Sequence, residues 1–380
     1  KVAIIGGCPC GLTAAYFLQL MGHQTTVFEE KSKLGGMLRY GIPNYRFPRE
    51  RLQQDIDAIL STGVDVKMNV QIGTEQIRKE YDAVYIAIGA HTDKKLGLEG
   101  EDSNNVISAV DMLRKIGDGN YPDFSGKRVV VVGGGNVAMD CARTAIRSNA
   151  ETVSIVYRRR QEDMTALAAE VEGAIAEGIE LLTLKAPLRV EADENGNACA
   201  LWVQPQIIGP VKGGRPAPRK ANKPEERIEC DIVLVAIGQD IVSKPFEDFG
   251  IAANRGRLCA DDSGALNMVG IYAGGDCVSG PATVIKAIAA GKAAAANIDE
   301  YLGFHHPISV DVDIPEPLLN DKVPCGRVNL SEKEAWARRD NFEGIEYSMS
   351  NEEAVQEASR CLRCDRHGCG VLRGGRQDRW

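Results

Sequence analysis

A chain of 380 residues is long enough for about two to three domains and a full hydrophobic core. Its net charge of -8 excludes general nucleic-acid binding, and no run approaches the roughly twenty apolar residues of a membrane span. Eleven cysteines in an unstapled chain of this length indicate a reducing, cytoplasmic compartment with some thiols used as metal ligands. No signal peptide is visible, and the start at Lys1 without a methionine indicates a segment of a longer polypeptide.

A glycine-dense turn near the start of the chain follows a short apolar strand at residues 1–5 and precedes a helix-like stretch at residues 12–20. This order is typical of a dinucleotide pyrophosphate cradle, because phosphate binds the backbone N–H groups at a helix N-terminus. Gly6 and Gly11 supply the tight turn and the close contact between helix and strand. Glu29 ends the next strand, where a carboxylate accepts hydrogen bonds from ribose hydroxyls.

Cys8 occupies the position of the second glycine in this fingerprint. Glycine at that position lets the backbone approach the pyrophosphate closely. The substitution therefore affects how closely a cofactor sits. Cys8 and Cys10 are either small buried side chains or a redox pair, and the single residue between them would strain a disulfide.

A second cradle follows the strand at residues 128–132, with a helix expected at residues 139–148. Gly133, Gly135 and Ala138 fill the three positions of the G-x-G-x-x-G/A form. The chain therefore carries the same nucleotide-binding plan twice.

Arginines replace the acidic residue in the second copy, where Arg158, Arg159 and Arg160 follow the strand at residues 152–156. Guanidinium groups pair with a 2′-phosphate, which a carboxylate would repel. We predict an adenine dinucleotide with a free ribose in the first site and NADP(H) rather than NAD(H) in the second. The alternative is a solvated run of charge.

The remaining elements complete the two copies. Two strands and a hairpin-like insertion are expected to complete the second copy, and residues 210–226, which are rich in Pro, Gly and Lys, predict an exposed loop. Further strands are expected at residues 25–28, 64–70, 81–90, 229–239 and 267–276, and helices at residues 49–61 and, buried, at 285–298.

Asp276 follows the last of these strands, and a long alanine-rich helix begins near Thr283. A carboxylate at this place hydrogen-bonds a polyol, and a helix N-terminus stabilises negative charge on a reduced ring. The alternative for Asp276 is a turn or helix-capping residue.

The carboxyl-terminal cysteines Cys361, Cys364 and Cys369 have C-x₂-C-x₄-C spacing, so that their thiolates converge on one metal centre. A short helix at residues 351–360 leads into them. Cys325 is the remaining candidate for a fourth ligand, with His367 as its alternative. Other cysteines are expected in the core: Cys141, Cys199, Cys230, Cys259 and Cys277.

Together these motifs resemble the NADPH-side flavoprotein of bacterial glutamate synthase and its relatives. These relatives include the large subunit of the ferredoxin-dependent transhydrogenase and the amino-terminal part of dihydropyrimidine dehydrogenase. The resemblance covers about residues 1–301 and rests on the first glycine turn and on LGGMLRYGIPNYRFP, VVVVGGGNVAMD, VYRRRQEDMTA, VLVAIGQ and YAGGDCVSGPATVIKAIAAGKAAA.

The resemblance implies an α/β fold with two Rossmann-like domains, in which a glutathione-reductase-like FAD domain holds an inserted NADP domain. Residues 1–112 and 242–301 would form the FAD domain, residues 113–241 the NAD(P) domain, and residues 302–380 an irregular cysteine-containing extension. It implies FAD on Gly6, Gly11, Glu29, Gly36, Leu38, Arg46, Ala90, Gly275, Asp276 and Thr283. It implies NADPH on Gly135, Asn136, Val137, Arg158, Arg159 and Gly238.

The carboxyl-terminal cysteines are similar in spacing to the iron–sulfur motifs that accompany this family. We therefore expect a [4Fe–4S] cluster on Cys325, Cys361, Cys364 and Cys369, with zinc and free or disulfide-bonded thiols as alternatives. Three departures from the family pattern are Cys8 and Cys10 for glycine and alanine, Thr165 for proline, and the lack of an amino-terminal iron–sulfur region.

The sequence therefore predicts an FAD-dependent NAD(P)H oxidoreductase module that exchanges electrons with iron–sulfur partners, ferredoxin among the candidates, within a multisubunit complex. One alternative is the glutamate synthase small subunit, which supplies NADPH electrons for glutamate formation. A thioredoxin-reductase-like enzyme needs a Cys-x-x-Cys pair, and residues 11–360 contain none. The alternative of another class is a non-catalytic structural or electron-relay module.

Overall fold

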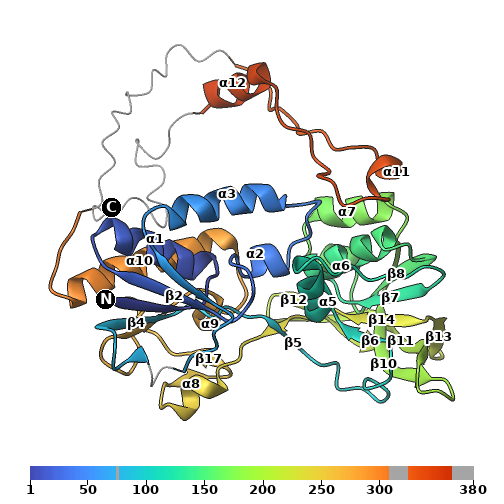
Figure 1. The fold of residues 1–380 in the computed structure, drawn as a ribbon. Coiled ribbons are helices and arrows are strands. Elements are labelled where there is room, and N and C mark those ends of the chain that lie inside the picture. The colour runs from blue at the N-terminus through green and yellow to red at the C-terminus, as the bar shows by residue number, and fades with distance from the viewer. Residues whose placement is uncertain (74–76, 308–323, 362–380) are drawn as a thin grey trace.

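The computed structural model describes residues 1–73, 77–307 and 324–361 of the chain. Two α/β lobes lie side by side, and residues 324–361 extend from beside the second lobe to a position above the lobes (Figure 1). The expectation of two Rossmann-like units is confirmed, because each lobe is built on a five-stranded parallel sheet.

The sheet of the first lobe has the order β18-β4-β1-β2-β3. Its strands are β1 (Val2–Ile5), β2 (Thr25–Glu29), β3 (Asp65–Met68), β4 (Ala83–Ile86) and β18 (Ile271–Ala273). β1 and β4 are buried throughout, as strands covered on both faces must be. Because β18 pairs with β4, a late segment of the chain completes a sheet of early strands.

Three helices cover one face of this sheet: α1 (Pro9–Leu20), α3 (Arg49–Leu60) and α10 (Val284–Tyr301). The α1 and α10 helices approach closely at Gly291, where a Cβ atom would lie 2.2 Å from the carbonyl oxygen of Cys10. The other face packs on a core that includes α8 (Lys244–Asp248), β16 (Ala253–Asn254) and β17 (Arg257–Leu258).

The sheet of the second lobe has the order β6-β14-β7-β8-β9. Its strands are β6 (Val106–Ser108), β7 (Arg128–Val132), β8 (Thr152–Tyr157), β9 (Glu180–Thr183) and β14 (Ile232–Val235). One face packs on α5 (Ala109–Gly117), α6 (Asn136–Arg147) and α7 (Ala168–Ala176). The other packs on an antiparallel sheet of β10 (Lys185–Ala192), β11 (Ala198–Lys212), β12 (Arg215–Lys220) and β13 (Glu226–Glu229).

The expected hairpin-like insertion is present as the β11–β12 hairpin. Most of residues 210–226 are exposed as expected, but the loop assignment is wrong, because much of this segment belongs to the two strands. Gly213 and Gly214, both with positive φ, make its turn. Pro216 and Pro218 fit because β12 pairs only with β11, and an edge strand tolerates residues that cannot donate a hydrogen bond.

Two further expectations need correction. The first half of α10 is not buried, since the Ile285 side chain is 69% exposed and Val284 and Ile288 are also exposed. Cys259 is exposed rather than in the core, and Cys199 is half-buried. Burial of α10 begins at Gly291, where the helix meets α1.

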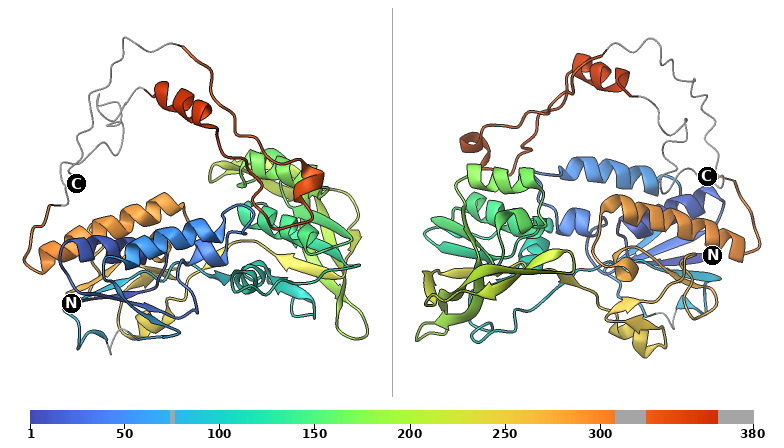
Figure 2. Two further views of the ribbon diagram at one scale, coloured as in Figure 1. Left: turned by 45° about the horizontal axis from the view of Figure 1, so that its top comes forward. Right: turned by 180° about the vertical axis from the view of Figure 1, so that it is seen from behind.

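The lobes are connected by the antiparallel pair β5 (Thr92–Asp93) and β15 (Gln239–Asp240). The carboxyl-terminal segment carries α11 (Ala335–Arg338), which lies beside α7, and α12 (Asn351–Ser359), which stands apart from both lobes (Figure 2). Short helices also occur at α2 (Met37–Tyr40), α9 (Asp276–Ser279) and the 3₁₀ turn Gln161–Asp163. Among the described helices, none is both long and apolar enough to cross a bilayer.

Candidate functional site: two nucleotide cradles

A cavity of about 580 Å³ opens at the carboxyl ends of β1, β2 and β4. Its volume is in the range of small-molecule sites, and its place follows the rule for open parallel sheets. Four of the predicted cofactor residues line it: Gly6, Glu29, Gly36 and Ala90.

Glu29 organises the rim of this cavity. Its Oε2 accepts a hydrogen bond from Gly7 N at 2.7 Å, and its Oε1 accepts one from Lys31 N at 2.8 Å. Burial raises the pKa of Glu29, and these two hydrogen bonds oppose that rise. The carboxylate therefore fixes the glycine turn while it faces the cavity.

The glycines of the turn are required by the backbone. Gly6 has a φ of +108°, and a Cβ atom there would lie 2.4 Å from the carbonyl oxygen of Ala87. At Gly11 it would lie 2.0 Å from the carbonyl oxygen of Gly6. Residue 8 at the start of α1 gives no side-chain cap to the first turn of the helix. The backbone N–H groups in the first turn of α1 are therefore available to bind the phosphates of a dinucleotide.

Cys8 forms part of the cavity wall, and its Sγ donates to the carbonyl oxygen of Ala87 at 3.0 Å. Burial raises the pKa of the Cys8 thiol to about 11, so it stays protonated. The Sγ of Cys10 instead lies 2.9 Å from the Tyr85 hydroxyl in the core. Both are free thiols, so the structure favours the interpretation as small, largely buried side chains over the redox pair.

The other predicted FAD residues lie outside the lining of this cavity. Asp276 opens α9, and its Oδ1 accepts a hydrogen bond from Ala282 N at 3.2 Å, which braces the loop before α10. Thr283 is the residue before α10 and makes no side-chain cap. Gly275 has a φ of +74° and packs on Cys10, and Leu38 packs on the first core.

The second cradle has the same construction. Gly133 has a φ of +155°, and a Cβ atom there would lie 2.3 Å from the carbonyl oxygen of Ala236. Gly135 precedes α6 without a side-chain cap. The side chain of Asn136 accepts a hydrogen bond from Leu167 N at 2.9 Å, and Val137 packs on the second core. Gly238, with a φ of +127°, follows β14.

The three arginines after β8 have different surroundings. Arg160 is bound by Asp163 at 2.9 Å, whereas Arg158 is exposed and forms no ion pair within the described part of the chain. Arg159 Nε donates to the carbonyl oxygen of Pro216 at 3.0 Å. The β11–β12 hairpin therefore positions one of the two arginines predicted to bind a 2′-phosphate, a contact that the sequence did not predict.

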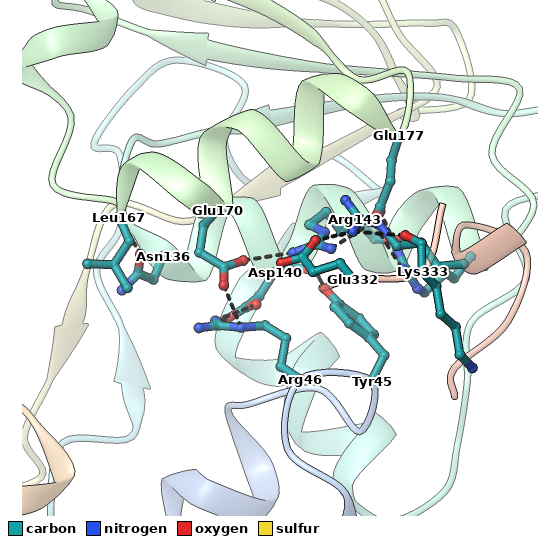
Figure 3. A network of polar contacts seen from close by, with 12 residues as sticks. Tyr45, Arg46, Asn136, Asp140, Arg143, Leu167, Glu170, Glu177, Glu332 and Lys333 are labelled. Atoms are coloured by element: carbon teal, nitrogen blue, oxygen red, sulfur yellow. Dashed lines mark hydrogen bonds and ion pairs between the residues drawn. The ribbon is translucent and has the colours of Figure 1, made fainter. Parts of the chain in front are cut away.

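Arg46 was expected to contact FAD, but its guanidinium is bound by Asp140 at 2.9 Å and by Glu170 at 3.0 Å. These contacts belong to a buried ionic network between the lobes, shown in Figure 3. We call it the inter-lobe network and define it by Arg46, Asp140, Arg143, Arg147, Glu170, Glu177 and Arg338.

Glu177 is the centre of this network and is completely buried. Arg143 and Arg147 of α6 bind it at 2.7 and 2.6 Å, and Arg338 of α11 binds it at 2.9 Å. Sequence reasoning missed this network. The local signal was the i, i+4 pair of arginines on α6, but their partners are distant in the chain.

The predicted metal ligands are described only in part, because Cys364 and Cys369 lie outside the described residues. Cys325 and Cys361 are both exposed. The Sγ of Cys325 lies 3.9 Å from the carbonyl oxygen of Gln356 in α12, the helix that leads directly into Cys361. The structure thus brings Cys325 to the helix that precedes the other three cysteines.

The comparisons agree with the two-cradle plan. A family model described as pyridine nucleotide-disulphide oxidoreductase matches residues 1–291. The NADP(+)-dependent formate dehydrogenase subunit beta of Moorella thermoacetica is 39% identical over 394 residues, which cover 98% of this chain and 56% of that protein. The glutamate synthase [NADPH] small chain of Escherichia coli is 32% identical over 327 residues, covering 80% of this chain and 68% of that protein.

Among solved structures, Mycobacterium tuberculosis FprA in complex with NADPH has a TM-score of 0.68 at 19% identity, covering 80% of this chain and 84% of that chain. This likeness shows the fold. The present chain spans little more than half the length of the formate dehydrogenase subunit. The chain belongs to the pyridine nucleotide-disulphide oxidoreductase family and is an NAD(P)H-dependent flavin oxidoreductase.

Proposed function

We propose that this chain is the NADPH- and FAD-binding module of a multisubunit electron-transfer enzyme, which exchanges single electrons with iron–sulfur centres. The observation that carries the proposal is the presence of two glycine cradles, each at the carboxyl end of a parallel sheet, in two lobes joined by buried ion pairs. These residues suit electron flow in either direction.

The first cradle fits an adenine dinucleotide with a free ribose. The uncapped start of α1 offers N–H groups to a pyrophosphate, and the Glu29 carboxylate faces the cavity where a ribose would lie. Bound FAD supplies the link between two-electron hydride chemistry and one-electron transfer. Asp276 and Thr283, beside the start of α10, are proposed to orient the flavin end.

The second cradle is proposed to hold NADPH. Arg158 is free of ion pairs to other described residues, and Arg159 is oriented by its bond to Pro216, so both guanidinium groups are available to a 2′-phosphate. Gly135, Asn136 and Val137 begin α6, where the pyrophosphate would meet N–H groups. We propose that residues 1–112 and 242–301 form the FAD domain and that residues 113–241 form the NADPH domain.

The carboxyl-terminal segment is proposed to hold a [4Fe–4S] cluster on Cys325, Cys361, Cys364 and Cys369. Support comes from the contact of Cys325 with α12 and from the cysteine spacing that follows this helix. The nine cysteines that the structure describes are all free thiols, which supports a reducing, cytoplasmic setting.

The names of the relatives support a role inside a complex, since one is a beta subunit and another is a small chain. We therefore propose iron–sulfur subunits as partners, with ferredoxin as a further candidate. The terminal reaction is then supplied by those partners and not by this chain.

The experiment is anaerobic purification of the full chain, followed by quantitation of flavin, iron and sulfide and by addition of NADPH. We expect one FAD, a four-iron content, and loss of the flavin absorbance band on adding NADPH, with a weaker response to NADH. A Cys361→Ser variant should lose iron but keep FAD and its reduction by NADPH. A preparation that takes up no FAD, or a bound flavin that NADPH does not reduce, would contradict the proposal.

A further inference from the structure

Two histidines and an aspartate meet at the outer end of the first lobe. His23 lies between α1 and β2, Asp299 lies in the last turn of α10, and His306 follows that helix. His23 Nε2 lies 2.6 Å from Asp299 Oδ1, and His306 Nδ1 lies 2.7 Å from the same oxygen. All three potential ligand atoms lie within 4.8 Å of one another.

The charge of Asp299 makes this cluster unusual. Its side chain is 3% exposed, and no lysine or arginine in the described ranges forms an ion pair with it. It also lies at the carboxyl end of an 18-residue helix, where the helix dipole disfavours a negative charge. The Oδ2 atom accepts a hydrogen bond from His306 N at 2.8 Å, and the hydrogen bonds to Asp299 lower the pKa of its carboxyl. The charged carboxylate is therefore present to bind a cation through Oδ1, beside the two imidazoles.

We propose that His23, Asp299 and His306 bind a divalent transition metal ion of the zinc class. Two imidazole nitrogens and one carboxylate oxygen form a donor set that zinc accepts. Bonds of about 2.0–2.1 Å in tetrahedral geometry place ligand atoms about 3.3 Å apart. From the present 2.6 and 2.7 Å, the two nitrogen–oxygen distances would each lengthen by about 0.6–0.7 Å to reach that separation. The two ring nitrogens now lie within 4.8 Å of each other and would settle at a similar separation.

The surroundings leave the ion one open coordination position. The His306 side chain is 43% exposed, which gives the ion an entry path and leaves room for a water molecule as fourth ligand. Phe304 stacks on His306 with ring centres 5.2 Å apart and meets His23 edge-on at 5.5 Å. None of the three ligands lines the cavity of the first cradle. The ion would tie the turn after α1 to the end of α10 and to the start of the carboxyl-terminal segment.

The test uses the full chain, stripped with a chelator and dialysed against zinc, with bound zinc measured by mass spectrometry and its ligands by X-ray absorption. We expect one zinc per chain with nitrogen and oxygen ligands at about 2.0–2.1 Å. Zinc bound by the terminal cysteines would instead show sulfur ligands at about 2.3 Å, so X-ray absorption separates that site from the proposed one.

His306→Ala should lose this equivalent of zinc, whereas His305→Ala, at the exposed neighbouring histidine, should keep it. Zinc should raise the melting temperature of the parent chain and of His305→Ala but not of His306→Ala, and flavin content reports that each variant is folded. Equal zinc binding by His306→Ala and the parent, zinc bound by sulfur alone, or no bound zinc would overturn the proposal.

Discussion

Arg46 and Asp140 form an ion pair that joins the two lobes: Arg46 Nη1 donates to the two carboxylate oxygens at 2.9 and 3.0 Å. Arg46 lies before α3 in the first lobe, and Asp140 lies in α6 of the second. Glu170 of α7 binds the same guanidinium at 3.0 Å. The relative position of the two cradles is therefore held by side chains as well as by the chain connections.

Replacing Arg46 tests how much this ion pair between the lobes stabilises the fold. Arg46→Ala leaves Asp140 buried without its partner and should lower the free energy of unfolding by about 2 to 3 kcal/mol. Urea unfolding gives this difference. Arg51→Ala is the control, because Arg51 is exposed and contacts only Gln54 among the described side chains. Equal effects of the two substitutions would contradict a role for the ion pair.

We expect the stability of the fold to depend on pH through the buried side chain of Asp140. Burial raises the pKa of Asp140 from 3.8 to about 6, and Arg46 opposes the rise. The folded protein therefore binds this proton more tightly than the unfolded chain, and the contribution of Asp140 to stability falls as pH rises from about 4 to about 6. The change is about 3 kcal/mol. Asp140→Asn should remove this part of the stability profile, which thermal unfolding across that pH range measures. A profile identical to that of the parent would contradict the assignment.

Cys8 is expected to weaken FAD binding, since its side chain occupies the wall of the cradle where the fingerprint has glycine. Cys8→Gly should increase the affinity of the apoprotein for FAD several-fold, as measured by flavin fluorescence. Cys10→Ala is the matched control, because its thiol points to Tyr85 in the core. No gain from Cys8→Gly would show that the thiol does not limit the approach of the cofactor.

Arg158 and Arg159 are expected to select NADPH. Arg158→Ala and Arg159→Ala should raise KM for NADPH at least tenfold and change KM for NADH little, because only NADPH carries the 2′-phosphate. Arg160→Ala is the control, since Asp163 already binds that guanidinium. Steady-state kinetics with NADPH and with NADH measure both KM values for each variant. Equal changes with NADPH and NADH would refute the 2′-phosphate role.

The two cradles could be predicted from the sequence because strand, glycine turn and helix are adjacent in the chain. A hairpin-like insertion could also be expected, but β12 as its second strand could not, since Pro216 and Pro218 are typical of loops and only the edge position of β12 makes them compatible with a strand. Arg46 and Asp140 are 94 residues apart, so their pairing depends on how the lobes meet. Local patterns carry no information on that contact.

The isolation of α12 has a consequence for assembly. This helix has nine residues, a capping box at Ser350 and Glu353, and no buried side chain. A peptide of that length is marginal as a helix in water, even with a good cap. Apart from its cap, the helix is held by hydrogen bonds to the segment that carries Cys325: Gln356 Nε2 donates to Gly326 O at 2.8 Å, and Glu357 accepts from Val328 N. A metal on the adjoining cysteines would strengthen this attachment, so we expect metal loading to precede recognition of this helix by another subunit.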